Sequence, residues 1–352
     1  MSDTQKPIIA VCGASGAQGG SVVEYLLNDP DHSFRVRGLT RNVDSQKAKA
    51  LAARGVEIVR ADLNDVESLK KAFEGAHGVF GLTNFWEVLS AEIEIRHGKN
   101  LVDAAAAVGV KQFVWSTLDH TSDPEVPHWD SKAAVDDYLK EKGLPRTSLY
   151  TSFYYENHLI FPSLTVTKRP DGRLVADWPC MLTDGPIGGY SVAETGAYVL
   201  EAFKKPQEWI GKDMRVISDI FTPRQFAQAL SEVLRKEIEL VETNSERFHA
   251  QKVGDYELWA KWVISLALLR DFAADKFFTS LHRLHLATVS RCSCLEVHDP
   301  VAHRTLPHVE WFYKNNGNPN RDLKLTLRIN PSRKDHRAFI EANKDAFLAA
   351  SS

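Results

Sequence analysis

The sequence of 352 residues has little cysteine, no excess of positive charge and no long hydrophobic run. Its four cysteines and the polar start MSDTQKP, without an apolar signal region, are typical of a reducing compartment. The formal net charge of −3 gives no basic surface for nucleic acid or anionic lipid, and no apolar run reaches membrane-spanning length. We therefore expect a cytoplasmic protein, with a nuclear location also compatible, that contacts neither nucleic acid nor membrane directly.

The sequence does contain a glycine-rich segment between a strand pattern and a helix pattern. Residues 8–12 read IIAVC, which is typical of a buried parallel strand, and residues 13–19 read GASGAQG. Apolar residues then recur at helical spacing over residues 22–27. In this context glycines permit a positive φ, close approach of a pyrophosphate and close helix–strand packing. The GxxGxxG segment predicts a dinucleotide site, although a turn that binds nothing is the alternative.

Strand and helix patterns alternate through the first half of the chain. The six expected strands cover residues 8–12, 34–40, 56–62, 77–83, 111–117 and 146–152. Such alternation is typical of parallel strands joined by right-handed helical crossovers. The sequence therefore predicts an α/β fold in which residues 1–153 form a Rossmann-type, doubly wound parallel sheet that binds the dinucleotide.

The pattern loosens beyond residue 154, where we expect a smaller mixed α/β lobe over residues 154–352. Residues 164–178 read as a hairpin with Pro170-Asp171-Gly172 at the turn. Ser191 and Glu194 have capping-box spacing at the start of one helix, and Thr222 precedes Pro223 at the start of another. Residues 256–272 predict a strongly apolar helix. We expect this lobe to cover the carboxyl ends of the strands and to bind a substrate or a partner.

Residues 279–309 have no convincing period and stand apart from the rest of the sequence. This segment holds five histidines and two cysteines, namely His282, His285, His298, His303, His308, Cys292 and Cys294. These are zinc-ligand types, but CxC and HxxH are not standard structural-zinc spacings and no CxxC pair is present. We expect no metal here and an irregular insertion, of a kind that a retained intron would also encode.

The residues after the second strand indicate which dinucleotide is bound. NAD-binding domains usually place an acidic residue there, whereas this chain reads Thr40-Arg41-Asn42. Arg41 suits a charge-assisted bond to a 2′-phosphate, so we expect NADP(H), with a solvated surface arginine as the alternative. Asp62, which ends the third strand, could accept from the adenine amino group or serve as a loop or capping residue.

Five segments together resemble the NmrA-like proteins, an atypical branch of the short-chain dehydrogenases and reductases. These segments read GASGAQGGSV (13–22), LTRN (39–42), LTNFWE (82–87), WDSKAAVDDYLKEKGLPRTSLYTSFYYEN (129–157) and LKLTLRINP (323–331). The resemblance extends to about residue 347 and breaks at residues 279–309.

The resemblance implies that NADP(H) lies along the strand ends. It assigns the pyrophosphate to Gly13, Ala14, Ser15, Gly16, Ala17 and Gln18 in the turn that Gly19 completes. It assigns the 2′-phosphate to Arg41, the adenine to Asp62 and Leu63, and the nicotinamide side to Thr83, Asn84, Phe85, Lys132, Tyr154, Tyr155, Glu156 and Asn157. Ordinary packing is the alternative for the aromatic residues, Trp86 included.

The candidate catalytic residues depart from the pattern of active relatives. Short-chain reductases use Tyr-x-x-x-Lys, but here His128 precedes Lys132 at that spacing, while Ser116 stands where the resemblance places the catalytic serine. Our first hypothesis is an NADPH-dependent oxidoreductase of an unknown small-molecule substrate, with Lys132 or His128 as the acid. The second is a redox sensor that acts through a regulatory protein partner such as a transcription factor. A structural protein with a vestigial site is a third. A monomer or a homodimer is compatible with each.

Overall fold

The computed structural model describes residues 6–121, 126–161, 164–179, 181–244, 246–247 and 321–350. These residues form two compact units, of which the first holds those within 6–156, 186–221 and 321–342. The second unit holds those within 157–185, 222–247 and 343–350. The irregular segment 279–309 and the predicted helix at 256–272 lie outside the described residues. Within the described ranges, no helix combines the length and the apolar character that a membrane crossing requires.

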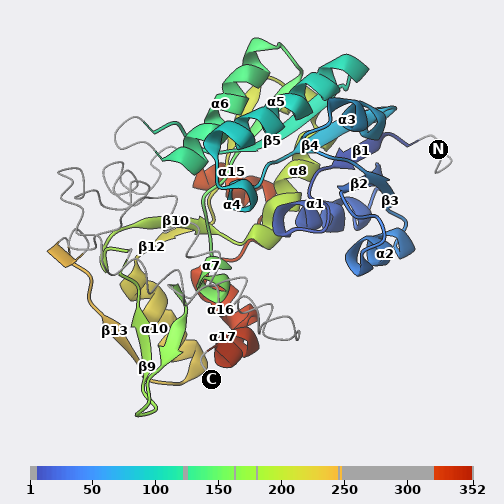
Figure 1. The fold of residues 1–352 in the computed structure, drawn as a ribbon. Coiled ribbons are helices and arrows are strands. Elements are labelled where there is room, and N and C mark those ends of the chain that lie inside the picture. Colours follow the sequence, from blue (N-terminus) through green and yellow to red (C-terminus); the bar gives the residue numbers. More distant parts are fainter. Residues whose placement is uncertain are drawn as a thin grey trace, which may run out of the picture. The chain divides into compact units, whose positions relative to one another are not determined.

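A seven-stranded sheet forms the centre of the first unit (Figure 1). Its strands are β1 (Ile8–Val11), β2 (Arg35–Thr40), β3 (Glu57–Arg60), β4 (Ala76–Gly81), β5 (Gln112–Thr117), β6 (Arg146–Tyr150) and β11 (Lys212–Arg215). Their order is β11-β6-β5-β4-β1-β2-β3, and every neighbouring pair is parallel. The predicted Rossmann-type sheet is therefore confirmed, and all six expected strands are present.

Helices cover both faces of this sheet. They are α1 (Ala17–Leu27), α2 (Gln46–Ala53), α3 (Val66–Phe73), α5 (Ala91–Val108), α6 (Pro127–Glu141), α8 (Thr195–Lys204), α9 (Pro206–Trp209) and α15 (Leu323–Ile329). The short helix α4 (Phe85–Val88) contacts α5. Side chains alternate along β1, so Ile9 and Val11 enter a core with α1 and α8, whereas Ala10 and Cys12 enter a core with α3, α5 and α6. Figure 1 shows α1 beside α8 and α5 beside α6.

The chain returns to the first unit after leaving it. A second, three-stranded sheet there joins β7 (Phe153–Tyr154), β10 (Ile187–Tyr190) and β12 (Asp219–Phe221), while β11 extends the main sheet beyond β6. A short 3-10 helix η3 (Val192–Glu194) and α16 (His336–Ala342) belong to the same unit. The division thus differs from the single change expected at residue 154, because later segments supply an edge strand and covering helices.

The second unit is a mixed α/β assembly, as predicted for the smaller lobe. It contains β8 (Val166–Lys168), β9 (Leu174–Asp177), β13 (Ile238–Val241), α7 (Asn157–Ile160), α10 (Pro223–Leu234) and α17 (Lys344–Ala350). The predicted hairpin is confirmed, with β8 antiparallel to β9 and Gly172 at a φ of 88° in the turn. Thr222 and Gln225 form a capping box at α10, with Pro223 in its first turn.

The predicted capping box at Ser191 is wrong. Ser191 makes no side-chain cap, and its Oγ instead donates to the Glu156 carboxylate at 2.6 Å. The same carboxylate accepts from the backbone N–H of Val192 at 2.9 Å. Glu156, which is distant in sequence, therefore accepts from the free N–H group at the start of η3. The spacing of residues near Ser191 cannot reveal such a partner.

Candidate functional site

The glycine turn between β1 and α1 has the backbone that the sequence predicts. Gly13 adopts a φ of 61°, in the left-handed region that favours glycine. A Cβ on Gly19 would lie 2.2 Å from the Gly13 carbonyl oxygen, so no larger residue fits between helix and strand here. Gly16 donates its N–H to the Gly13 oxygen at 2.8 Å and forms the N-cap of α1. The first turn of α1 holds no acidic residue that would oppose an anion at its N–H groups.

This turn lies at the point where the strand order of the sheet reverses. β1 pairs with β2 on one side and with β4 on the other, and chain order runs outward from both. In open α/β sheets, ligands bind beyond the carboxyl ends of the strands at such a point. Leu82, just after β4, lies 3.4 Å from the position that a Cβ on Gly13 would take. The geometry therefore brings the turn beside the segment that begins with Thr83.

Arg41 follows β2 and is exposed, as the sequence suggests, but its side chain has an ion-pair partner. Its guanidinium forms an ion pair with the Glu87 carboxylate of α4, with side-chain exposures of 70% and 43%. The β2 segment itself, Thr40-Arg41-Asn42, contains no carboxylate, which led to the prediction that none stands near Arg41. That prediction is corrected, because α4 supplies one from outside the β2 segment.

Asp62 and Leu63 form part of a tight loop after β3. The Asp62 carboxylate accepts from the backbone N–H of Asn64 at 2.9 Å and from its side chain at 3.1 Å. These bonds lower the pKa of Asp62. Asn100 of α5 donates to the Leu63 carbonyl oxygen at 2.8 Å. Asp62 therefore has the loop role that the sequence left open, and a contact with adenine stays a prediction.

A buried carboxylate organises the surroundings of Lys132. Glu94 of α5 forms an ion pair with the Lys132 ammonium, accepts from Thr83 Oγ1 at 2.8 Å and accepts from Ser131 Oγ. The Glu94 side chain is 0% exposed and that of Lys132 14% exposed. Sequence reasoning missed Glu94. The signal was its place on the apolar stripe of α5, in line with the buried Gly98.

The two other catalytic candidates, Ser116 and His128, lie in different surroundings. Ser116 is buried near the end of β5, and its Oγ donates to Gln18 Oε1 at 2.7 Å, which joins β5 to the glycine turn. The His128 ring lies 5.7 Å from the Phe85 ring and 5.0 Å from the Trp86 ring, centroid to centroid. The structure thus places Ser116 against Gln18 and His128 against Phe85. Both partners are residues that we predict to contact the cofactor.

Tyr155 occupies a packed interior position. Its hydroxyl donates to the Gly189 carbonyl oxygen at 3.1 Å and to the Asp219 carboxylate. Its ring lies 5.7 Å from Phe221 and 5.3 Å from Phe339. Burial and the nearby carboxylate raise the pKa of Tyr155 far above that of a free tyrosine. These contacts match the packing alternative for this residue.

The three neighbours of Tyr155 in the predicted site have separate roles in the structure. The Tyr154 ring lies 5.4 Å from that of Tyr190, and burial raises the pKa of Tyr154 to about 12. Glu156 holds the start of η3 through Ser191. Asn157 begins α7 in the second unit. Their contacts with a cofactor stay predictions.

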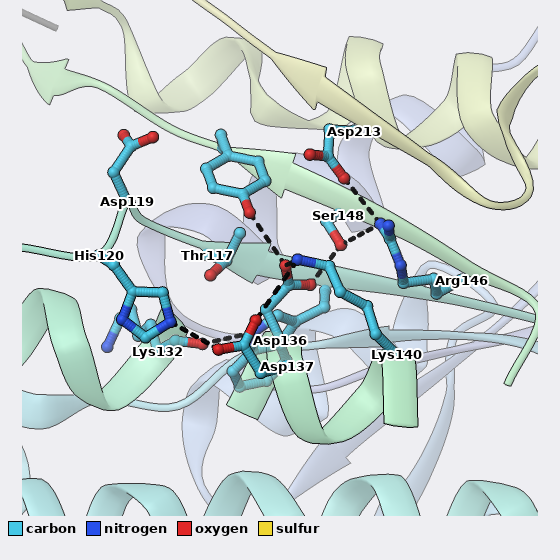
Figure 2. Close-up of polar contacts among 12 residues, drawn as sticks. Thr117, Asp119, His120, Lys132, Asp136, Asp137, Lys140, Arg146, Ser148 and Asp213 are labelled. Atoms are coloured by element: carbon cyan, nitrogen blue, oxygen red, sulfur yellow. Dashed lines mark hydrogen bonds and ion pairs between the residues drawn. The ribbon is translucent and has the colours of Figure 1, made fainter. Parts of the chain in front are cut away.

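Helix α6, which carries His128 and Lys132, is anchored to the sheet by a second buried carboxylate (Figure 2). Asp136 accepts from Ser148 Oγ and from Tyr150 Oη at 3.0 Å, and it pairs with Lys140 at 2.7 Å. Ser148 also accepts from Arg146 at 2.6 Å. These bonds link α6 to β6 one turn beyond Lys132 and so fix the helix that presents it.

The described part of the chain shows no group of three or more His, Cys, Asp or Glu side chains that could hold a metal ion. The histidines and cysteines considered as zinc ligands all belong to residues 279–309, outside the described ranges.

A model of the NmrA-like family matches residues 5–257 of the chain. The chain belongs to the NmrA-like family. An NmrA-like family domain-containing oxidoreductase of Aspergillus japonicus is 31% identical over 254 residues, which cover 68% of this chain and 76% of the relative. The nitrogen metabolite repression protein of Emericella nidulans is 30% identical over 250 residues, which cover 68% of each chain.

Solved structures share the fold over nearly the whole length. NmrA, a negative transcriptional regulator, superposes with a TM-score of 0.69 at 23% identity, covering 96% of this chain and 95% of that one. Its complex with NADP gives 0.65 at 22% identity, with the same coverage of both chains. The Citrobacter triphenylmethane reductase complexed with NADP(H) gives 0.63 at 20% identity, covering 96% and 99%. The predicted NmrA-like fold is confirmed.

Proposed function

We propose that this NmrA-like protein is an NADP(H)-dependent oxidoreductase that acts on a small molecule, in the cytoplasm or nucleus. The observation that carries the proposal is the glycine turn at the strand-order reversal. There Gly13 takes a left-handed φ and a Cβ on Gly19 would collide with the Gly13 oxygen. Such a turn leaves backbone N–H groups of α1 for a pyrophosphate. The NADP and NADP(H) complexes of NmrA and of triphenylmethane reductase support the same cofactor class.

We propose that residues after successive strands hold successive parts of the dinucleotide. Gly13 to Gly19 would hold the pyrophosphate, Arg41 the 2′-phosphate, and Asp62 and Leu63 the adenine. Thr83, Asn84 and Phe85 follow β4 beside the turn and would flank the nicotinamide ribose, whose hydroxyls Lys132 would bind. Tyr154 and Glu156 are the proposed nicotinamide-end residues, whereas Tyr155 packs in the interior against Phe221 and Phe339.

The bound nicotinamide would supply a hydride, and the chain must supply the accompanying proton. His128 and Lys132 lie four positions apart on α6, so they occupy the same side of the helix. Lys132 is held by Glu94, and His128 is held among aromatic rings. Either side chain can donate a proton to a substrate oxygen as the hydride arrives. We assign this role first to His128, with Lys132 as the alternative donor and Ser116 as a supporting hydroxyl.

A redox sensor is the second candidate function. It is favoured by His128 in the place of the expected tyrosine, and by the regulatory names of the Emericella relative and of NmrA itself. In this case NADP(H) binding would change the affinity for a regulatory protein such as a transcription factor, and the chain would act as a monomer or homodimer.

Cofactor titration tests what both functions share. We expect the protein to bind NADPH more tightly than NADH, and Arg41→Ala to lose about 1.5–3 kcal/mol of NADPH binding free energy, as for a charge-assisted bond. Isothermal titration calorimetry of both proteins with both cofactors measures this directly. Equal affinity of the unaltered protein for the two cofactors would contradict the proposal.

A further inference from the structure

Glu94 is a fully buried acid that the proposed reaction does not use. Its two carboxylate oxygens receive three side-chain donors: Thr83 from the segment after β4, and Ser131 and Lys132 from α6. We propose that Glu94 is a positioning residue that sets the nicotinamide half of the dinucleotide by holding Lys132 and Thr83. This inference rests on the proposed NADP(H) function.

The cost of burying Glu94 argues for a specific role. A carboxylate removed from water is tolerated only when donors or a cation satisfy it, and a buried ion pair is weak evidence for stability by itself. Glu94 has both a cation and hydrogen-bond donors, because the Lys132 ammonium and the hydroxyls of Thr83 and Ser131 all contact its carboxylate. An apolar residue at position 94 would continue the buried stripe of α5 without needing any hydrogen-bond donors. The buried charge of Glu94 therefore needs an explanation other than packing.

The position of Glu94 supplies that explanation. Lys132 and Thr83 come from different elements, and both are proposed contacts of the nicotinamide ribose. A lysine side chain is flexible, but a bond to a buried acid on the rigid helix α5 fixes its ammonium. An ammonium carries three N–H donors, so a bond to Glu94 is compatible with bonds to two ribose hydroxyls. One carboxylate thus fixes two groups around the same sugar.

Two probes separate positioning from a general structural role. NADPH contains both halves of the dinucleotide, whereas adenosine 2′,5′-bisphosphate contains the adenine half and no nicotinamide ribose. If Glu94 positions Lys132, Glu94→Gln should weaken NADPH binding at least about tenfold, the range for a lost bond to a charged group. Binding of adenosine 2′,5′-bisphosphate should change less than about twofold. A general loss of structure would weaken both ligands.

Glu92→Gln is the matched control. Glu92 lies in the same first turn of α5, but it is exposed, so the same chemical change there should alter neither affinity. Where Glu94→Gln fails to fold, Glu94→Asp keeps the carboxylate on a shorter side chain. It should weaken NADPH binding selectively as well, but by a smaller factor.

A double substitution tests whether the effect passes through Lys132. In the Lys132→Met background, Glu94→Gln should weaken NADPH binding by a clearly smaller factor than in the unaltered protein, because only Thr83 is left for Glu94 to position. Unchanged NADPH affinity in a folded Glu94→Gln or Glu94→Asp protein overturns the inference. An equal loss for both ligands overturns it too, as does an undiminished loss of NADPH affinity in the Lys132→Met background. Failure of the unaltered protein to bind NADPH would instead overturn the proposed function.

Discussion

Arg41 meets the Glu87 carboxylate in this structure, and a 2′-phosphate would compete for the same guanidinium. Glu87→Gln removes the competitor and a negative charge beside the incoming phosphate. We therefore expect NADPH affinity to rise by a few-fold, about 0.5–1 kcal/mol for an exposed pair, with little change for NADH. Parallel titrations of the two cofactors measure the change in preference.

The control for this substitution is Glu67→Gln on α3. Glu67 is also exposed and pairs with Lys70 at 2.7 Å, but it has no contact with Arg41 in the described contacts. A gain in NADPH affinity that Glu67→Gln reproduces would mean that overall charge, and not the Arg41 pair, sets the preference.

His128 distinguishes the reductase from the sensor. His128→Phe keeps an aromatic ring among Phe85 and Trp86 and removes the proton donor. A reductase that uses His128 should lose about 10²–10⁴-fold in turnover, with NADPH affinity nearly unchanged. In the unaltered protein, turnover should fall as pH rises, because the donor must carry its proton. NADPH oxidation with a panel of quinones, ketones and enones provides the measurement.

Two outcomes of this experiment redirect the interpretation. Turnover that survives His128→Phe would remove His128 from the reaction and leave Lys132 as the donor. A partner protein that binds only the NADPH-loaded or only the empty protein, with the same preference in His128→Phe, would support the sensor.

The contact between β1 and α1 depends on Gly19. A Cβ on Gly19 would lie 2.2 Å from the Gly13 oxygen, whereas a Cβ on Gly20 would lie 3.6 Å from the Ala14 oxygen. Gly19→Ala should therefore push α1 from the strand, lower the free energy of unfolding by at least about 2 kcal/mol and disrupt NADPH binding. Chemical denaturation and cofactor titration of the purified protein test both effects.

Gly20→Ala is the neighbouring control, and it should stabilise α1 slightly because alanine is the better helix former. Gly16→Val should behave differently from Gly19→Ala. A Cβ on Gly16 would lie 3.3 Å from the Gly13 oxygen, so the fold should persist while the side chain occupies the pyrophosphate position. Equal stability of the Gly19→Ala and Gly20→Ala proteins would show that the helix can move at little cost.

Elements defined by local pattern were predictable from the sequence, and elements defined by distant partners were not. The six strands, the 164–178 hairpin and the Thr222 cap each follow from periodicity or turn chemistry within one segment. β11 is a four-residue strand whose identity depends on pairing with β6, some 60 residues earlier in the chain. The Ser191 prediction failed for the same reason, because Glu156 replaced the local cap.

The candidate site divides in the same way. The glycine turn and Arg41 each directly follow a strand pattern, and their position after that strand indicates their role, so the sequence identifies them. Glu87 and Glu94 act on residues that are distant in sequence, namely Arg41 and Lys132. Spacing along one segment says nothing about such partners, and only the folded arrangement reveals them.

Asp119 joins a late segment of the chain to the rest of the first unit. It pairs with Arg321 and Arg215 at 2.8 and 2.7 Å, and the Arg321 side chain is 1% exposed. Arg321 also donates to the Thr151 carbonyl oxygen at 2.6 Å. Burial acts to raise the pKa of Asp119, but the two arginines outweigh it and hold that pKa below its usual range. Asp119→Asn should cost about 3–5 kcal/mol of unfolding free energy at neutral pH, because it leaves buried arginine charge without its partner.

The ion pairs of Asp119 with Arg321 and Arg215 also make the free energy of unfolding depend on pH. Since the folded pKa of Asp119 is lowered, its contribution is present above about pH 4, the unfolded value, and is lost as pH falls through the folded pKa. The stability difference between the unaltered protein and Asp119→Asn should therefore shrink in acid. Asp103→Asn, which breaks a more exposed pair with Lys142, serves as the control and should leave the unfolding midpoint nearly unchanged. A pH-independent difference for Asp119→Asn would contradict the assignment.

The return of the chain to its first unit has a consequence for biosynthesis. A ribosome delivers residues in order, so β6 emerges with an unpaired edge and must wait for β11, while α1 waits for α8 to cover its core. The segment around α15 arrives later still, after the residues of the second unit up to 247 have been synthesised. A nascent chain therefore carries an open sheet edge and uncovered apolar surface through much of its translation, which is the condition under which chaperones are recruited.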